Sequence, residues 1–78
     1  MTTIKSTCGK YAVNFIKNGG RNDAVIAMAN LATGSTAYGD TTYEYWFYIG
    51  KYKSEKTAIR QSVKRMRQHG IELAIPNN

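Results

Sequence analysis

The sequence predicts a small α+β protein in which a three-stranded antiparallel sheet carries a C-terminal helix on one face. Three observations support this fold class: an alternating segment that ends at an Asn-Gly pair, an aromatic segment typical of a strand, and a basic segment with helix signals at both ends. At 78 residues the chain has room for one modest core. We therefore expect residues 1–78 to form a single small basic domain, with residues 76–78 as a frayed tail.

The first two strands are predicted around a hairpin turn. Residues 10–17 alternate in character, and Asn18-Gly19, the strongest short hairpin signal, follows at once. Residues 24–32 are apolar on every side and are harder to assign. Their alanines, methionine and leucine favour a helix that Asp23 would cap, whereas the hairpin signal favours a returning strand. We favour the strand, and the helical alternative would give the order β-α-β-α.

Residues 43–49 hold five aromatic side chains, an isoleucine and one charge, which is typical of a half-buried strand. Strict alternation places Phe47 and Ile49 beneath the helix, and Trp46 and Tyr48 on the opposite, open face. On this pattern Tyr43 and Tyr45 share the face of Phe47, and Glu44 shares that of Trp46. Two-sided burial, or ordinary surface tyrosines with hydrated hydroxyl groups, is the alternative.

A helix is predicted between Ser54, a good N-cap, and Gly70, which permits a left-handed stop. Its apolar residues recur at helical spacing, so that one narrow stripe should face the sheet. The stripe consists of Ile59, Val63 and Met66, with Ala58 and Ser62 beside them. Residues 71–75 should add a short edge strand or pack against the helix end.

Positive charge is concentrated on the predicted helix. Eleven basic residues against five acidic ones give a formal net charge of +6, and seven of the eleven lie between residues 51 and 67. Four of them form a continuous ridge, and no acidic residue of the helix after Glu55 neutralises it. This asymmetry favours an anionic partner, with a solubilising helix face as the alternative. The basic ridge consists of Lys56, Arg60, Lys64 and Arg67.

The junction at residues 49–58, with the sequence IGKYKSEKTA, resembles one found in two families of DNA-binding domains. These are the AP2/ERF domains and the arm-binding N-terminal domains of phage and transposon integrases. Their third strand ends in a hydrophobic-Gly-x-aromatic pattern, and a Ser/Thr cap opens a helix with alanine in its first turn. The resemblance implies a three-stranded sheet that binds DNA in the major groove. The matching positions are Ile49, Gly50, Tyr52, Ser54 and Ala58.

Small basic α+β chains of this size also resemble accessory proteins of phages and mobile elements, including anti-CRISPR inhibitors. That resemblance implies a different partner, a host nucleic-acid-handling protein complex. Such a complex would be bound through an aromatic and arginine surface.

We therefore expect a binding protein with one of two partners. A nucleic-acid-binding module would neutralise phosphates with its cations and stack its aromatic rings on bases or sugars. An inhibitor would use the same residue types against a protein, so composition does not distinguish the two. A homodimer formed through an exposed strand edge is a third option. The candidate site consists of Trp46, Tyr48, Lys51, Lys53, Lys56, Arg60, Lys64 and Arg67.

No pattern in the sequence indicates catalysis, a metal or a cofactor. His69 is the sole histidine, and no spacing of Cys, His and Asp resembles a metal site. Gly19-Gly20 lacks the Gly-Lys-Ser/Thr of a phosphate-binding loop. Tyr48-Ile49-Gly50 matches half of the GIY-YIG nuclease signature, but the Gly-Ile-Tyr half is absent. We expect no enzyme and no small-molecule substrate.

The single cysteine, Cys8, excludes an intrachain disulfide and suggests a reducing, cytoplasmic setting. We expect it to be an inert structural thiol near the start of the first strand. No hydrophobic run is long enough for a signal peptide or a membrane span, so no membrane partner is expected.

Overall fold

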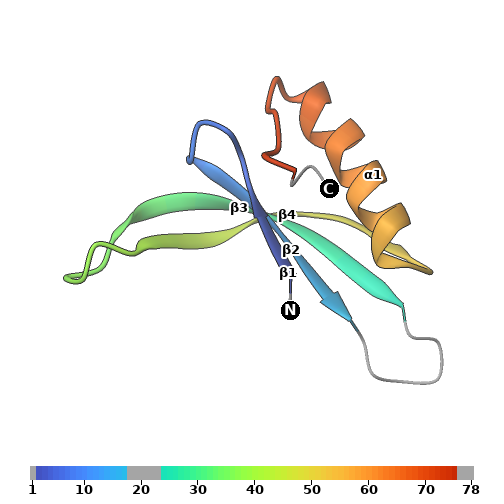
Figure 1. The fold of residues 1–78 in the computed structure, drawn as a ribbon, viewed down its shortest axis with the longest axis horizontal. Coiled ribbons are helices and arrows are strands. Elements are labelled where there is room, and N and C mark those ends of the chain that lie inside the picture. The colour runs from blue at the N-terminus through green and yellow to red at the C-terminus, as the bar shows by residue number, and fades with distance from the viewer. Residues whose placement is uncertain (1, 18–23, 76–78) are drawn as a thin grey trace.

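The computed structural model describes residues 2–17 and 24–75, which form a four-stranded antiparallel sheet and one helix. The elements are β1 (Thr2–Lys5), β2 (Tyr11–Lys17), β3 (Val25–Ser35), β4 (Thr41–Tyr52) and α1 (Glu55–Gln68). The strands lie in the order β1-β2-β3-β4, and α1 covers one face of the sheet (Figure 1). The predicted turn at Asn18-Gly19 and the predicted tail at residues 76–78 lie outside the described residues.

The predicted α+β class with a C-terminal helix is confirmed, but the prediction of three strands is wrong. The missed strand is β1, in which only Ile4 is buried. This short strand pairs with β2 from Thr2 opposite Phe15 to Lys5 opposite Ala12. Its conformation therefore depends on a partner strand and on one core contact, and a local pattern of four residues does not reveal either.

Of the predicted segment 24–32, residues 25–32 belong to β3, as favoured from the sequence, and the β-α-β-α alternative is wrong. Val25, Ala27 and Ala29 of β3 are buried in one cluster with Ala58 of α1. Ala27, Ala29 and Ala58 have no exposed surface, because their small side chains let the helix approach the sheet closely. The small alanine side chains of β3 therefore allow α1 to pack closely on this strand.

The ends of α1 confirm the two signals predicted from the sequence. The side-chain oxygen of Ser54 accepts a hydrogen bond of 3.2 Å from the backbone N–H of Thr57. At the other end Gly70 has a φ of +74°, a conformation that glycine adopts without steric cost. The N–H of Ile71 then donates to the carbonyl of Met66 at 2.9 Å, as in a Schellman motif. Gly70 thus turns the chain back toward β1.

After this turn the C-terminal segment runs alongside β1. Leu73 forms an isolated antiparallel bridge with Ser6, and the N–H of Ala74 donates to the carbonyl of Lys5 at 2.8 Å. Ile71 and Leu73 are buried in the core. The segment therefore combines the two predicted alternatives, since it pairs briefly at the sheet edge and also packs near the helix end.

The buried stripe of α1 is displaced by one residue from the predicted stripe. Ala58, Ser62 and Met66 are fully buried, whereas Ile59 and Val63 are only half-buried. The close approach of the helix to β3 favours the smaller side chains at the contact. The displacement leaves Ile59 and Val63, two large apolar side chains, partly exposed on the flank of the helix.

The predicted alternation along β4 is wrong for Trp46. The pairing of β3 with β4 shifts register twice in this region, and Trp46 and Ile49 are extra residues without a partner on β3. Trp46 consequently contacts the rings of Phe47 and His69 on the helix side of the sheet. Tyr45, predicted beneath the helix, is instead 60% exposed.

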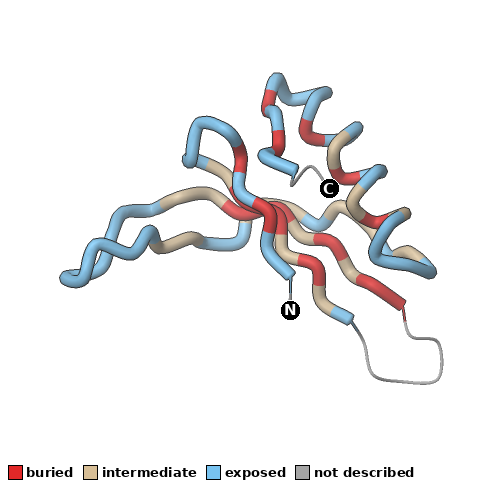
Figure 2. The backbone as a smooth tube through the Cα atoms, in the orientation of Figure 1, coloured by how far each residue is buried: buried red, intermediate tan, exposed pale blue. Residues whose placement is uncertain are grey.

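The β3–β4 hairpin extends well beyond the part of the sheet that α1 covers. We call residues 33–44 the arm, and nearly all of it is exposed (Figure 2). Its turn is closed by two backbone hydrogen bonds, from Thr36 to Asp40 at 2.8 Å and from Gly39 to Thr36 at 3.0 Å. Tyr38, near the tip, is 94% exposed. The arm therefore forms exposed surface and adds no buried side chain to the core.

Candidate functional site

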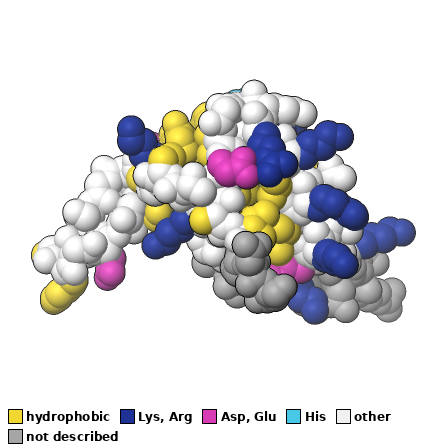
Figure 3. Space-filling model, turned by 45° about the horizontal axis from the view of Figure 1, so that its top comes forward, with side chains coloured by type: hydrophobic (Ala, Val, Ile, Leu, Met, Phe, Trp, Pro, Cys, Tyr) yellow, Lys and Arg dark blue, Asp and Glu magenta, His cyan; other side chains and the backbone are white. Residues whose placement is uncertain are grey.

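The four residues of the basic ridge are all exposed on α1. At 100° per residue they fall within about 80° of arc around the helix axis, on its outward side. Lys and Arg side chains gather along this side of the molecule (Figure 3). Within residues 2–17 and 24–75, Lys56, Arg60 and Lys64 form no ion pair with a carboxylate. These three side chains are therefore available to an anionic ligand.

Arg67, the fourth member of the ridge, is paired with Glu72 from the C-terminal segment. Its Nε donates to Glu72 Oε2 at 3.0 Å and its Nη2 to Oε1 at 2.8 Å, a two-point contact. These hydrogen bonds, together with the charges of the pair, raise the pKa of Arg67 and lower the pKa of Glu72. Helical spacing did not predict this pair, because Glu72 lies beyond the end of the helix.

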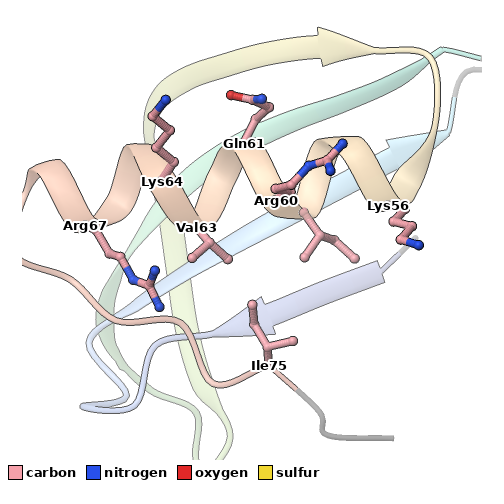
Figure 4. A pocket seen from close by; sticks show the side chains of 8 residues that line it. Lys56, Arg60, Gln61, Val63, Lys64, Arg67 and Ile75 are labelled. Carbon is pink, nitrogen blue, oxygen red and sulfur yellow. The ribbon is translucent and has the colours of Figure 1, made fainter.

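A hollow of about 690 Å³ lies between the basic ridge and the C-terminal segment. Val63 and Arg67 point toward this segment, and Ile75 points back toward the helix (Figure 4). Ile75 is 42% exposed, so the apolar surface inside the hollow is open to solvent. No local pattern predicted the hollow, because it depends on the displaced stripe of α1. Its lining residues are Lys56, Ile59, Arg60, Gln61, Val63, Lys64, Arg67 and Ile75.

Lys51 lies near the end of β4 and Lys53 just beyond it, so neither lysine is on the helix that carries the ridge. The register pairs Lys51 with Ile26, which alternates with core residues of β3, so Lys51 lies on the open face of the sheet. Lys53 lies beside Lys17 and Glu55 near the start of α1. The structure therefore does not bring these two lysines into the basic ridge.

Trp46 belongs to an aromatic cluster near the C-terminal end of α1. Its ring stacks on Tyr11 with 5.5 Å between centroids, meets Phe47 edge-on at 4.7 Å and lies 5.5 Å from His69. The guanidinium carbon of Arg65 lies 5.5 Å from the centroid of the Phe47 ring. These contacts join β2, β4 and the end of the helix, so Trp46 has a clear packing role.

Tyr48 lies on the open face, as the alternation predicted, and is 50% exposed. Tyr45 shares this face because it pairs with Asn30, as Tyr48 pairs with Met28. The eight candidate residues thus occupy three surfaces: the ridge, the aromatic cluster, and the open face with its adjoining corner. A single short ligand on the ridge would not contact Tyr48.

Cys8 is exposed in the turn between β1 and β2, so the prediction of a structural thiol is wrong. Its Sγ lies 3.3 Å from Ser6 Oγ, and this hydrogen bond is the main factor that lowers the pKa of the thiol.

Within residues 2–17 and 24–75, no three His, Cys, Asp or Glu side chains gather as metal ligands would. The same residues contain no helix that is long and apolar enough to cross a membrane. Comparison with known proteins found no matching family model, no matching curated protein and no matching solved structure.

Proposed function

We propose that this protein binds nucleic acid through the basic ridge. The observation that carries the proposal is the set of three exposed cations, Lys56, Arg60 and Lys64, on one side of a helix that is capped at both ends. None of them is paired with a carboxylate of the described residues. A row of such cations along one side of a helix suits the regularly spaced phosphates of a nucleic acid.

The proposal predicts how binding depends on salt. Each cation that neutralises a phosphate releases counterions, so the logarithm of the association constant falls with the logarithm of the salt concentration. The slope is about −0.9 per contact for duplex DNA and about −0.7 for single strands. Three contacts from Lys56, Arg60 and Lys64 therefore predict a slope of roughly −2 to −3. We assign Tyr48 and Lys51 no part in this interface, because they lie on the open face.

The test is an anisotropy titration of labelled oligonucleotides, carried out with duplex DNA, single-stranded DNA and single-stranded RNA at several salt concentrations. Arg60→Glu combined with Lys64→Glu should weaken binding at low salt at least a hundredfold, because two contacts become repulsive. The matched control is Lys5→Glu combined with Lys10→Glu, which changes the net charge equally at exposed positions away from α1. Circular dichroism checks that both variants remain folded.

Comparison of the two double variants distinguishes a local binding site from a general effect of net charge on affinity. If both double variants lose affinity equally, net charge alone drives the interaction and the ridge is not the site. If the protein binds none of the oligonucleotides even at low salt, the proposed function is wrong.

A second candidate function is binding to a protein through the arm. Residues 33–44 include Asp40 and Glu44 and contain no lysine or arginine, although the chain as a whole is strongly basic. Tyr38 projects near the tip with 94% of its surface exposed. Such a surface repels phosphate, whereas it complements the basic grooves of proteins that handle nucleic acid. An inhibitor of a host nucleic-acid-handling complex would use it in this way.

The test of this candidate is capture of partners from a nuclease-treated bacterial lysate on immobilised protein. Tyr38→Ser combined with Asp40→Lys should abolish capture, whereas the Arg60→Glu, Lys64→Glu variant should retain it. The opposite pattern, capture that depends on the ridge and not on the arm, would rule out the arm as the protein-binding surface.

A further inference from the structure

The hollow beside the basic ridge combines an apolar interior with a cationic margin. Ile59 and Val63 of the helix line it. Ile75 points toward Val63, while Lys56 and Arg60 lie at its margin (Figure 4). A ligand that consisted only of phosphates would leave this apolar surface uncovered. The hollow therefore suits a ligand that carries both negative charge and a flat, weakly polar group.

We propose that the hollow receives an unpaired base of a single-stranded nucleic acid, while the neighbouring phosphates contact Lys56, Arg60 and Lys64. This inference rests on the proposed function and specifies its ligand class. Sites for small molecules usually measure roughly 300–1,000 Å³. The hollow, at about 690 Å³, is therefore large enough for a base with its sugar.

A double helix does not offer the required group. Its bases are paired and stacked, so their faces are covered and only their edges are exposed in the grooves between the sugar-phosphate backbones. Ile59, Val63 and Ile75 would then face a charged backbone and gain little burial. A single strand exposes its bases, which gain free energy by leaving water for an apolar or planar surface.

Arg67 supplies a planar surface within the hollow. Both of its hydrogen bonds to Glu72 lie in the plane of the guanidinium group, so the carboxylate fixes that plane. The Arg67 side chain remains 62% exposed, so it is accessible to a ligand. Guanidinium planes are established stacking surfaces for unpaired bases. Because Glu72 already balances its charge, Arg67 acts here as a stacking surface and contributes little to phosphate binding.

The first experiment compares three probes of equal length: a single-stranded DNA, the matching duplex, and a single strand made of abasic sites. The abasic strand keeps the phosphates and lacks the bases. We expect the ordinary single strand to bind about tenfold more tightly than the other two, with a salt slope close to that of the abasic strand. Equal affinity for all three probes, with binding still dependent on Arg60 and Lys64, would overturn the inference and leave the proposed function intact.

The second experiment replaces the planar guanidinium group of Arg67 without changing the charge at this position. Arg67→Lys should lower the affinity for the single strand several-fold, with no change in the salt slope and no effect on the abasic strand. The matched control is Arg65→Lys, which makes the same change on the same helix at a side chain outside the hollow. Equal losses in the two variants would contradict the stacking role of Arg67.

Glu72→Gln provides an independent readout. The neutral amide no longer balances the charge of Arg67 and no longer fixes the plane of its guanidinium group. We expect this variant to bind both single strand and duplex with a salt slope about one unit steeper. Its preference for the single strand should fall at the same time. An unchanged slope would contradict the assignment of Arg67 as a charge-balanced stacking surface. If the unmodified protein binds no probe at all, the proposed function itself fails, and this outcome is distinct from those above.

Discussion

The two halves of the β3–β4 hairpin belong to one antiparallel strand pair, which is interrupted by three register shifts, and they have opposite surroundings. In the half beneath α1, Val25, Ala27 and Ala29 are buried against the helix. In the other half, the arm, Tyr38 is 94% exposed and hydrogen bonds among Thr36, Gly39 and Asp40 close the turn. Strand pairing therefore continues past the core, and side-chain hydrogen bonds such as that between Thr33 and Thr42 accompany it there.

Positively and negatively charged residues are divided between the same two regions. The helix-covered half carries the basic ridge, whereas the arm carries Asp40 and Glu44 and no cation. A nucleic acid that approaches the molecule is attracted to one half and repelled by the other, so it would be oriented before contact. This separation is the reason why we propose nucleic acid as the partner of the ridge and a protein as the partner of the arm.

The largest difference between the halves should appear in stability. Met66→Ala removes a fully buried side chain at the contact of α1 with the sheet and should lower the free energy of unfolding by about 2–5 kcal/mol. Tyr38→Ala in the arm should change it by no more than about 0.5 kcal/mol. Urea denaturation followed by circular dichroism measures both. A comparable loss in the two variants would mean that the arm belongs to the cooperative core.

A smaller effect is expected at the end of α1. Gly70→Ala places a Cβ on a residue with a φ of +74°, and the cost should be about 1–2 kcal/mol. A Cβ at this position would meet no other atom within 4 Å among the described residues, so the cost is conformational alone. Gly70→Asn, which tolerates this conformation better, should lose less stability. Equal losses for Ala and Asn would show that the backbone conformation is not the cause.

A gain in stability is expected at Ser62. Its side-chain oxygen is buried in α1 and has no hydrogen-bond partner among the described residues. Ser62→Ala removes this unsatisfied group and improves helix propensity, so the free energy of unfolding should rise by up to about 1 kcal/mol. In the arm, Thr33→Val removes an exposed hydroxyl that lies 2.9 Å from Thr42 Oγ1, and thermal denaturation should detect almost no change. A loss of stability in Ser62→Ala would contradict the assignment of an unsatisfied hydroxyl.

The smallest effect concerns the pH dependence of the Arg67–Glu72 pair. Arg67 lowers the pKa of Glu72 below its ordinary value of 4.5, so folding favours the ionised carboxylate. The stabilisation is complete at pH values well above 4.5 and is lost as the pH falls through the lowered pKa. Both side chains are more than half exposed, so solvent screens the pair. Urea midpoints of the wild type and Glu72→Gln should converge as the solution becomes acidic, and a constant difference would contradict this linkage.

Elements with strong local signals were predicted well. The caps of α1 at Ser54 and Gly70 are set by hydrogen bonds and backbone conformation within a few residues, so the sequence reveals them directly. The assignment of residues 24–32 to a strand was also correct, although the Asn18-Gly19 pair that favoured it lies outside the described residues. The exposed positions of the basic ridge also follow from helical spacing alone.

Features that depend on contacts between distant segments were not predicted. The strand β1 exists through pairing with β2, and the two register shifts in β4 move Trp46 to the helix side. The hollow requires Ile75 to return beside Ile59 and Val63 after the turn at Gly70. None of these features has a signature within a window of ten residues.

The sequence by itself determined the fold class, the bounds and caps of the helix, and the presence of a cationic row on it. Propensity, capping and periodicity act between near neighbours, and the chain carries that information locally. Tertiary structure decided which face of α1 is buried, that Glu72 pairs with Arg67, and that an apolar hollow opens beside the ridge. These outcomes depend on how closely a helix packs on an alanine-rich strand and on where the chain returns, and only the assembled core fixes both.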